Sequence, residues 1–191
     1  DEKLGKLPLI RMHYLTPALF QPGDAEMDML GHILAGGEFG RLTKALTRDK
    51  SLASTTMVYQ QSMEQISVFS VDVVLNPGVD ENEVVQEIDT VFGGLITNPP
   101  SAGEIERARN SILKNQLFSL QTLGGYTGRA EMLQSYNRFA NNPGFLKDDI
   151  ARYQAVDQKA LESYAKGYLK NGARTILIAK PIEPRVAIQG K

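Results

Sequence analysis

Residues 66–75, with the sequence ISVFSVDVVL, form the stretch that decides the fold class. β-Branched and aromatic residues dominate it, and the Asn-Pro-Gly turn at residues 76–78 ends it, so the stretch predicts a β-strand. Its hydroxyl and acid positions, Ser67, Ser70 and Asp72, indicate one polar face.

A second predicted strand precedes this one at residues 52–60 (LASTTMVYQ), and the polar residues 61–65 lie between them. Two consecutive strands joined by a loop of this length favour an antiparallel hairpin. Residues 7–15 (LPLIRMHYL) and 174–179 (RTILIA) predict two further strands.

Apolar residues at helical spacing predict the remaining elements. The predicted helices cover residues 24–35, 38–48, 81–95, 101–120, 126–139, 145–153 and 157–169. We expect Asp24 and Asp157 to be helix N-caps, and Ser101 with Glu104 to form a capping box, because such side chains satisfy backbone N–H groups that a helix start leaves without partners.

The order of these elements does not alternate strictly between strand and helix, which argues against a doubly wound parallel sheet. We predict one α+β domain over residues 1–181, a mainly antiparallel sheet with helices packed on one face. Residues 182–191 have no periodic pattern and are predicted to be a disordered tail.

Composition limits the classes of function. The 191 residues are 42% hydrophobic and 23% charged, with 21 Lys plus Arg against 22 Asp plus Glu, and the net charge is −1. A near-neutral chain disfavours a nucleic-acid partner. No apolar run approaches the ~20 residues of a membrane span. The first residues lack the apolar run of a signal peptide and a starting Met, so we interpret the chain as a mature product or a piece of a longer protein.

The inventory of metal-binding and nucleophilic residues is small. The absence of Cys excludes disulfides and thiolate zinc sites. His13 and His32 are 19 positions apart, and neither belongs to an H-x-x-E-H motif, so we predict no metal ligand here. No G-x-S-x-G motif is present, and we predict no catalytic and no cofactor-binding residue.

Two other patterns have ordinary structural explanations. The glycine clusters at residues 36–41 and 124–129 precede helices and could hold an anion, but neither matches a phosphate-binding motif, and Gly is a common helix stop. Paired acids such as Asp148 and Asp149 are expected in the first turn of a helix, where their negative charge interacts favourably with the helix dipole.

Several motifs occur in a particular order along residues 9–181. They are Tyr14-x-x-Pro17, Leu34-x-Gly36-Gly37, Glu104-Ile105-x-x-Ala108 and Leu123-Gly124-Gly125-Tyr126. The ordered set resembles the second αβ domain of a half-unit in the pitrilysin/insulinase-type zinc metallopeptidases, as found in large bacterial members. In that family an H-x-x-E-H motif on a neighbouring domain supplies the zinc site and the general base. The resemblance therefore implies a processing-peptidase/insulinase-like fold without zinc in this chain, zinc in the neighbouring domain, and a peptide substrate in the full assembly.

Members of this family also have a functional Arg and, seven residues after it, a Tyr. These two residues help to hold the substrate and stabilise the oxyanion of the transition state. Arg48 occupies the Arg position. Ser54, or Thr55 if no gap is allowed, replaces the Tyr, and Tyr59 lies too far along the chain. This departure from the family pattern implies that the chain is the second domain of the zinc-bearing half or belongs to a degenerate half. In either case it builds the wall of a substrate chamber and carries no catalytic residue.

Two alternatives remain open beside this metalloendopeptidase domain. One is a non-peptidase scaffold or assembly subunit of the same fold. The other is an unrelated stand-alone enzyme that uses Arg48, His13 or His32. The resemblance implies other domains or a partner subunit of the same peptidase as partners and an extracytoplasmic (periplasmic) location. An apolar face left without those domains is expected to drive self-association.

Overall fold

A computed structural model describes residues 7–125 and 128–181, and the tail predicted at 182–191 lies outside this range. Its strands are β1 (Leu9–Thr16), β2 (Ala53–Gln61), β3 (Ser67–Leu75) and β4 (Arg174–Ala179). They form one sheet in the order β2-β3-β1-β4, and each neighbouring pair is antiparallel. The predicted hairpin and the antiparallel sheet are confirmed.

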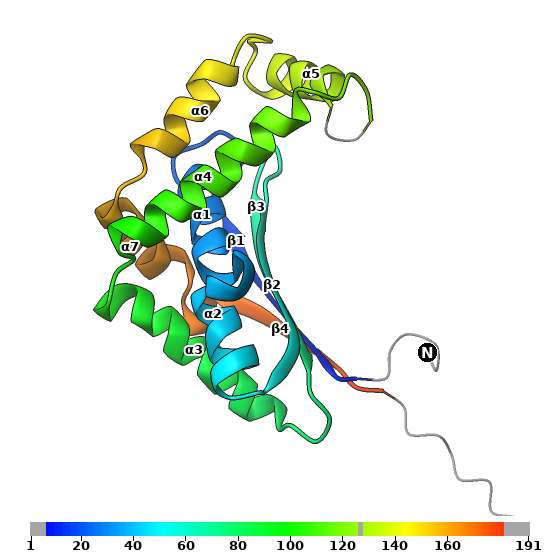
Figure 1. The fold of residues 1–191 in the computed structure, drawn as a ribbon, viewed down its shortest axis with the longest axis vertical. Coiled ribbons are helices and arrows are strands. Elements are labelled where there is room, and N and C mark those ends of the chain that lie inside the picture. The colour runs from blue at the N-terminus through cyan, green and yellow to red at the C-terminus, as the bar shows by residue number, and fades with distance from the viewer. Residues whose placement is uncertain (1–6, 126–127, 182–191) are drawn as a thin grey trace, which may run out of the picture.

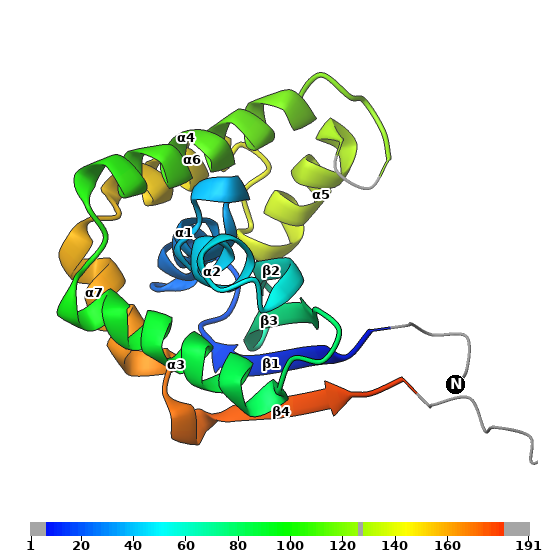
Figure 2. The same ribbon diagram turned by 60° about the horizontal axis from the view of Figure 1, so that its bottom comes forward.

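Six longer helices complete the fold: α1 (Asp24–Ala35), α3 (Glu81–Thr97), α4 (Ala102–Ser119), α5 (Arg129–Phe139), α6 (Leu146–Ala155) and α7 (Gln158–Tyr168). Helices α1, α3, α4, α6 and α7 lie on one side of the sheet, and α5 lies beyond one end of it, so the other side of the sheet is uncovered (Figures 1 and 2). The predicted α+β architecture with helices on one face is therefore confirmed.

The core lies between this sheet and its helices. It includes the alternating residues of β1 and β3, Ile10, Met12, Tyr14, Phe69, Val71, Val73 and Leu75, all fully buried. Each such side chain contributes about 1.5–3 kcal/mol relative to an exposed one. Ser67 also faces the core, where its Oγ accepts a hydrogen bond from the Met63 backbone N–H at 3.1 Å. The expectation that it shares a polar face with Ser70 and Asp72 was wrong, because only those two residues have the register of the opposite face.

The segment predicted as one helix over 38–48 consists of three shorter pieces. They are the 3₁₀ turn η1 (Gly37–Phe39), the α-helical turn α2 (Arg41–Thr43) and the π-helical turn η2 (Lys44–Asp49). The extended backbone of Gly40 separates η1 from α2, and a Cβ on Gly40 would lie 2.5 Å from the Leu34 carbonyl oxygen. Close backbone packing against the end of α1 therefore prevents a continuous helix.

Asp24 is not the N-cap of α1 as the sequence predicts. Gly23 holds that position with a φ of 103°, and its backbone N–H donates to the Glu26 carboxylate at 3.0 Å. Asp24 is buried in the first turn and accepts from the Phe20 N–H at 3.0 Å and from Ser62 Oγ at 2.5 Å. Tertiary partners thus use the side chain that the local pattern assigns to capping.

The two other predicted caps are confirmed. The Ser101 Oγ accepts from the Glu104 N–H at 3.4 Å, and the Glu104 carboxylate accepts from the Ser101 N–H at 2.8 Å, at the start of α4. Asp157 accepts from the Ala160 N–H at 2.8 Å at the start of α7. The predicted helix over 126–139 begins later, at Arg129, and residues 126 and 127 lie outside the described part.

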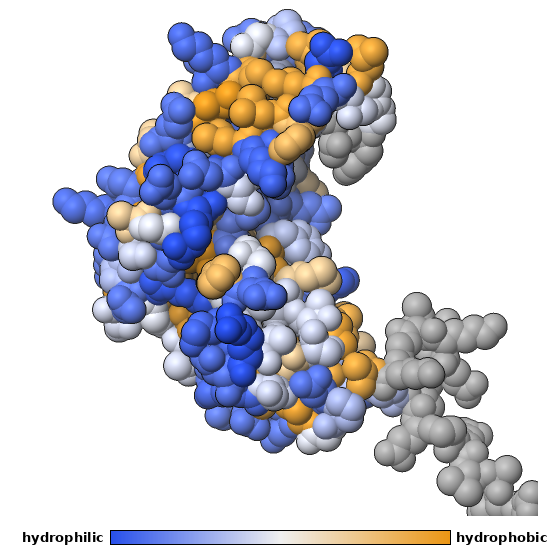
Figure 3. All heavy atoms as spheres, viewed as in Figure 1, coloured by the Kyte–Doolittle hydropathy of each residue, from blue (hydrophilic) through white to orange (hydrophobic). Residues whose placement is uncertain are grey.

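The molecule has a crescent outline, with α5 extending beyond one end of the sheet (Figure 1). Apolar residues gather at that end, where α4, α5 and α6 meet (Figure 3), and exposed Leu117 and Phe118 belong to α4 there. Of the helices that the structure describes, none combines the length and apolar character needed to cross a bilayer.

Candidate functional site

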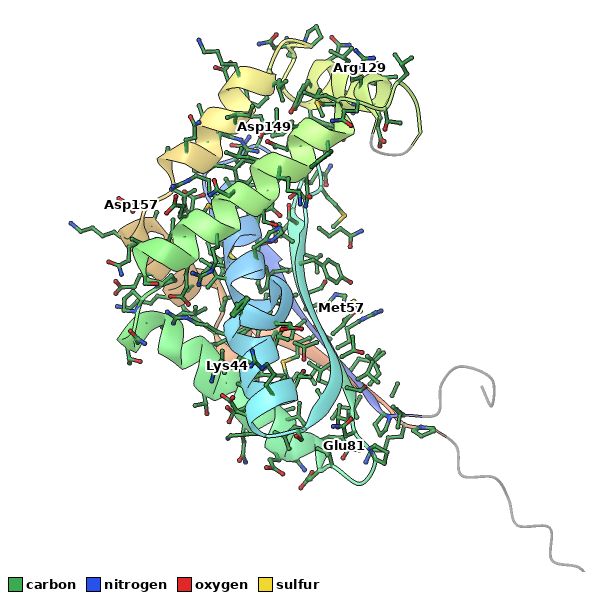
Figure 4. The ribbon with its side chains drawn as sticks, in the orientation of Figure 1. Lys44, Met57, Glu81, Arg129, Asp149 and Asp157 are labelled. Atoms are coloured by element: carbon green, nitrogen blue, oxygen red, sulfur yellow. The ribbon has the colours of Figure 1, made fainter. Side chains whose placement is uncertain are left out.

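The uncovered face of the sheet is the candidate functional site, and we call it the open face. Strand side chains alternate between the two faces, so the positions between the core residues point away from the helices. The register places six side chains side by side at its centre: Arg11, His13, Met57, Tyr59, Ser70 and Asp72. Figure 4 shows Met57 on the side of β2 opposite the helices.

Arg11 of β1 and Asp72 of β3 form an ion pair on the open face because they are directly opposite in the register. Arg11 Nε donates to Asp72 Oδ1 at 2.8 Å, and Nη2 donates to Oδ2 at 2.7 Å. The Asp72 side chain is 4% exposed, whereas that of Arg11 is 41% exposed. Hydrogen bonding to Asp72 raises the pKa of Arg11. The carboxylate is therefore covered, and the guanidinium is the part that faces outward.

Tyr59 and Ser70 add hydroxyl groups beside this pair. The Tyr59 hydroxyl donates to Asp72 Oδ2 at 3.4 Å. Ser70 lies directly opposite Tyr59 on one side and His13 on the other, and its buried Oγ has no hydrogen-bond partner within the described residues. The polar side chains that a bound chain could reach at this centre are therefore those of Arg11 and Tyr59, each 41% exposed.

A groove crosses the open face between β1, β4 and the end of α7. Its volume is about 950 Å³, at the upper end of the range of ligand sites. The residues that line it include Arg11, His13, Leu15, Tyr168, Arg174 and Leu177, and of these Arg174 has its side chain on the core side, in the register of Tyr14. Arg174 is 7% exposed and pairs with Asp89 of α3, and it also donates to the Tyr14 hydroxyl at 3.2 Å.

The structure does not bring Arg48 to this centre. Arg48 lies in η2 and is exposed. Thr55 lies on the open face opposite Val74, and Ser54 is the extra residue of an irregularity in β2, with its Oγ donating to the Val74 carbonyl at 3.2 Å. Of the two candidates for the missing Tyr, Thr55 therefore has the orientation of the open face.

Tyr59 shares that face with Thr55 but lies four residues further along β2. At about 3.3 Å per residue the two positions are about 13 Å apart. Tyr59 instead bonds to Asp72, which holds Arg11. Sequence reasoning missed the Arg11–Asp72 pair because its members are 61 positions apart, and the only available indication was a charged residue within each of two apolar strands.

The two histidines lie in different environments. His13 is on the open face, whereas His32 is in the last turn of α1, where burial lowers its pKa. In the part of the chain that the structure describes, no group of three or more His, Asp or Glu residues is placed to hold a metal ion.

A second polar cluster is buried between α1 and α6, on the helix side of the sheet. Arg152 of α6 donates to Asp149 Oδ1 at 2.5 Å and to Asp24 Oδ2 at 3.2 Å. Asp149 also accepts from the Tyr136 hydroxyl at 2.7 Å and from Gln116 Nε2 at 3.0 Å. Asp149 is in the first turn of its helix, as expected, but it is buried and joins α4, α5 and α6 (Figure 4).

Asp28 of α1 and Tyr153 of α6 extend this cluster between the two helices. The Tyr153 hydroxyl donates to Asp28 Oδ2 at 2.6 Å. Burial is the main cause that raises the pKa of Asp28 to about 7, although the Tyr153 hydrogen bond acts in the opposite direction. The cluster fastens the α5–α6 end to α1, and it lies apart from the open face.

The first glycine cluster has a structural role. Arg41, at its end, donates to both carboxylate oxygens of Glu104, at 2.6 and 3.0 Å, and to the Asn98 carbonyl at 2.7 Å. This bonding ties α2 to the start of α4 and holds the pKa of Glu104 at about 2. The second cluster includes residues outside the described range.

Comparison with known proteins now identifies the family. The sequence profile of the Peptidase M16 inactive domain matches residues 2–112, more than half of the chain. The chain belongs to this family. A comparison with curated proteins found no match.

Solved structures show the same fold in this M16 inactive domain. The inactive peptidase domain of a candidate zinc protease from Bordetella parapertussis aligns with a TM-score of 0.82 and 24% identity, over 97% of each chain. A candidate zinc protease structure from Bordetella pertussis gives 0.78 and 24%, over 92% of this chain and 95% of that one. A Helicobacter pylori protease gives 0.79 and 20%, and the match covers 92% of this chain but only 41% of that protease.

Proposed function

We propose that this M16 inactive domain forms part of the wall of a substrate chamber in a zinc-dependent metalloendopeptidase that cleaves peptides. In this proposal the zinc and the general base belong to a neighbouring domain of the same protease. The observation that carries the proposal is the open face, a complete concave face of the sheet that no helix of the described residues covers.

The side chains of the open face support a contact surface. An antiparallel sheet can leave one face to water, and such a face is then mostly polar. Here Leu15 and Leu177 are more than half exposed, and Met57 is nearly so. Exposed apolar residues that gather on one face beside polar groups are typical of a binding surface. A chamber wall of this kind holds and orients an extended peptide, and the chemical step takes place elsewhere.

The test is reconstitution from two purified parts, this chain and the zinc-bearing part of the same protease. We expect this chain alone to contain no stoichiometric zinc and to hydrolyse no quenched peptide. The zinc-bearing part alone is expected to hydrolyse the peptide at least tenfold more slowly than the mixture. Met57→Glu on the open face should reduce the stimulation, whereas Leu133→Glu, an exposed position on α5, should not.

Other outcomes identify the alternatives. Stoichiometric zinc with hydrolysis by this chain alone would mean a stand-alone enzyme and would overturn the proposal. If this chain associates stably with the other part of its protein, and that part binds no zinc and the mixture hydrolyses no peptide, then this chain is a scaffold subunit of the same fold. Full activity of the zinc-bearing part without this chain would show that the open face is not part of the chamber.

A further inference from the structure

The groove between β1, β4 and the end of α7 has an unequal distribution of charge. Arg11 and His13 line it from the open face, and no Asp or Glu is among its lining residues. The carboxylate that balances Arg11 is Asp72, which is covered beneath it. Arg174 also borders the groove, but its side chain shares the register of the core residue Tyr14, and its guanidinium pairs with Asp89 of α3 on the helix side.

Arg11 keeps unused hydrogen-bonding capacity. Arg11 binds Asp72 through Nε and Nη2, so its Nη1 group has no partner among the described residues. Arg174 offers no such donor to a ligand, because its terminal nitrogens bind Asp89 and Tyr14 and its Nε is buried. Because a guanidinium has five N–H donors in a fixed fork, it can bind a second acceptor while it keeps the first.

Apolar side chains stand next to Arg11 on the open face. Leu15 is 61% exposed and Leu177 is 56% exposed, and both line the groove with Tyr168. They lie on β1 and β4, whose residues are paired along the sheet. A ligand that fills this groove therefore needs an anionic group between apolar groups, in an extended shape.

We propose that this groove binds an extended peptide segment through an acidic side chain flanked by apolar residues. The carboxylate bonds to the outward guanidinium of Arg11, and the apolar neighbours pack against Leu15 and Leu177. The inference rests on the proposed function in that the ligand is a peptide, and it adds a preference for acidic sequence. An acidic peptide complements the groove because charge-assisted hydrogen bonds are the stronger ones.

The binding test uses the 191-residue chain and isothermal titration calorimetry. The probe is an eight-residue peptide with one Glu between two Leu residues, acetylated at one end and amidated at the other so that only the side chain carries charge. We expect a Kd of about 10–100 µM, as for a small binding surface. Replacing the Glu of the peptide by Gln should weaken binding about tenfold or more, and by Lys further. Raising the salt concentration should weaken only the Glu peptide.

Variants at the rim of the groove assign the binding to this site. Leu15→Glu and Leu15→Lys change an exposed side chain, so both should fold, and they remove the same apolar surface. We expect the Lys variant to bind the Glu peptide at least tenfold more tightly than the Glu variant does. Leu133→Glu on α5 lies outside the groove and should keep the affinity within about twofold.

The central pair has its own variant. Arg11→Gln alone would leave Asp72 covered without its cation, so the double variant Arg11→Gln with Asp72→Asn keeps a neutral hydrogen-bonded pair instead. We expect it to lose the preference for Glu over Gln in the peptide. Equal binding of the Glu and Gln peptides by the unmodified chain would overturn the proposal, as would equal binding by the two Leu15 variants.

These results are separable from the reconstitution experiment. If the mixture of the two parts hydrolyses peptides but the groove shows no acidic preference, the chamber function stands and the acidic preference falls. If the groove binds the Glu peptide but reconstitution fails, the groove remains a peptide site and the chamber function falls.

Discussion

Arg152→Met is the substitution that tests most directly how the α5–α6 end is held. Arg152 is the cation between Asp149 and Asp24, whose side chains are 6% and 1% exposed. Met is unbranched and fills similar space, so packing against Phe20, whose ring centre is 5.0 Å from the guanidinium carbon, changes little. The main effect is that two covered carboxylates lose their counterion.

The expected cost follows from the contacts that remain. Removing one partner of a buried ion pair costs about 3–5 kcal/mol, because an uncompensated charge stays buried. Asp149 keeps the Tyr136 and Gln116 hydrogen bonds, and Asp24 keeps the Ser62 hydrogen bond, and these bonds stabilise the charges in part. We therefore expect the lower end, about 3 kcal/mol. For a domain of this size this lowers Tm by about 6–12 °C.

Urea unfolding followed by circular dichroism measures the change, with Tm from thermal scans. The control Arg138→Met removes an exposed pair with Glu64 and should cost no more than about 1 kcal/mol. Adding Asp149→Asn to Arg152→Met removes one of the two uncompensated charges and should recover part of the loss. If Arg152→Met stays within about 1 kcal/mol of the unmodified chain, the cluster does not depend on charge compensation, and the reasoning is wrong.

Three further predictions concern other charged groups. The pKa of Asp28 is raised to about 7, so the folded state binds a proton that the unfolded state releases near pH 4, and the stability that Asp28 contributes is lost as pH rises from about 4 to 7. Asp28→Asn should therefore stabilise the fold at pH 8 by about 1–2 kcal/mol, which raises Tm by about 2–8 °C, and should change Tm little at pH 4, as measured by paired thermal scans. The pKa of Glu104 is lowered to about 2 by Arg41, so the stability that Glu104 contributes is present above about pH 4.5 and lost as pH falls through 2. Glu104→Gln should lower the free energy of unfolding by about 1–2 kcal/mol at pH 7, measured by urea unfolding. A loss of stability that does not change with pH would contradict an ionic origin. Arg48→Ala in the assembled protease should reduce kcat less than about threefold, whereas a loss of about 10²–10³ would make Arg48 an oxyanion donor.

The elements that the sequence predicts correctly are those with local causes. The turn at residues 76–78 ends β3, and the capping box of Ser101 and Glu104 starts α4, because each depends on residues within three positions of one another. Asp24 shows where local reasoning fails. Its pattern is that of an N-cap, but Arg152, 128 positions away, and Ser62 take its oxygens. No spacing in the sequence indicates such a competition.

The candidate site depends on register, which the sequence does not display. In β2, Ala53 pairs with Leu75 and Thr55 pairs with Val74, so Ser54 is an inserted residue. A shift of one residue moves each later side chain to the other face. If Ser54 were paired regularly with Val74, the side chains of Met57 and Tyr59 would point toward the helices.

The same insertion explains why the missing Tyr cannot be located by counting from Arg48. A count of seven positions reaches Thr55 and a count of six reaches Ser54, but only the irregular pairing decides which of the two faces the open side. It also brings Tyr59 beside Asp72, and thereby beside Arg11. The polar centre of the open face is thus produced by one inserted residue in β2 together with strand pairings between residues up to 61 positions apart.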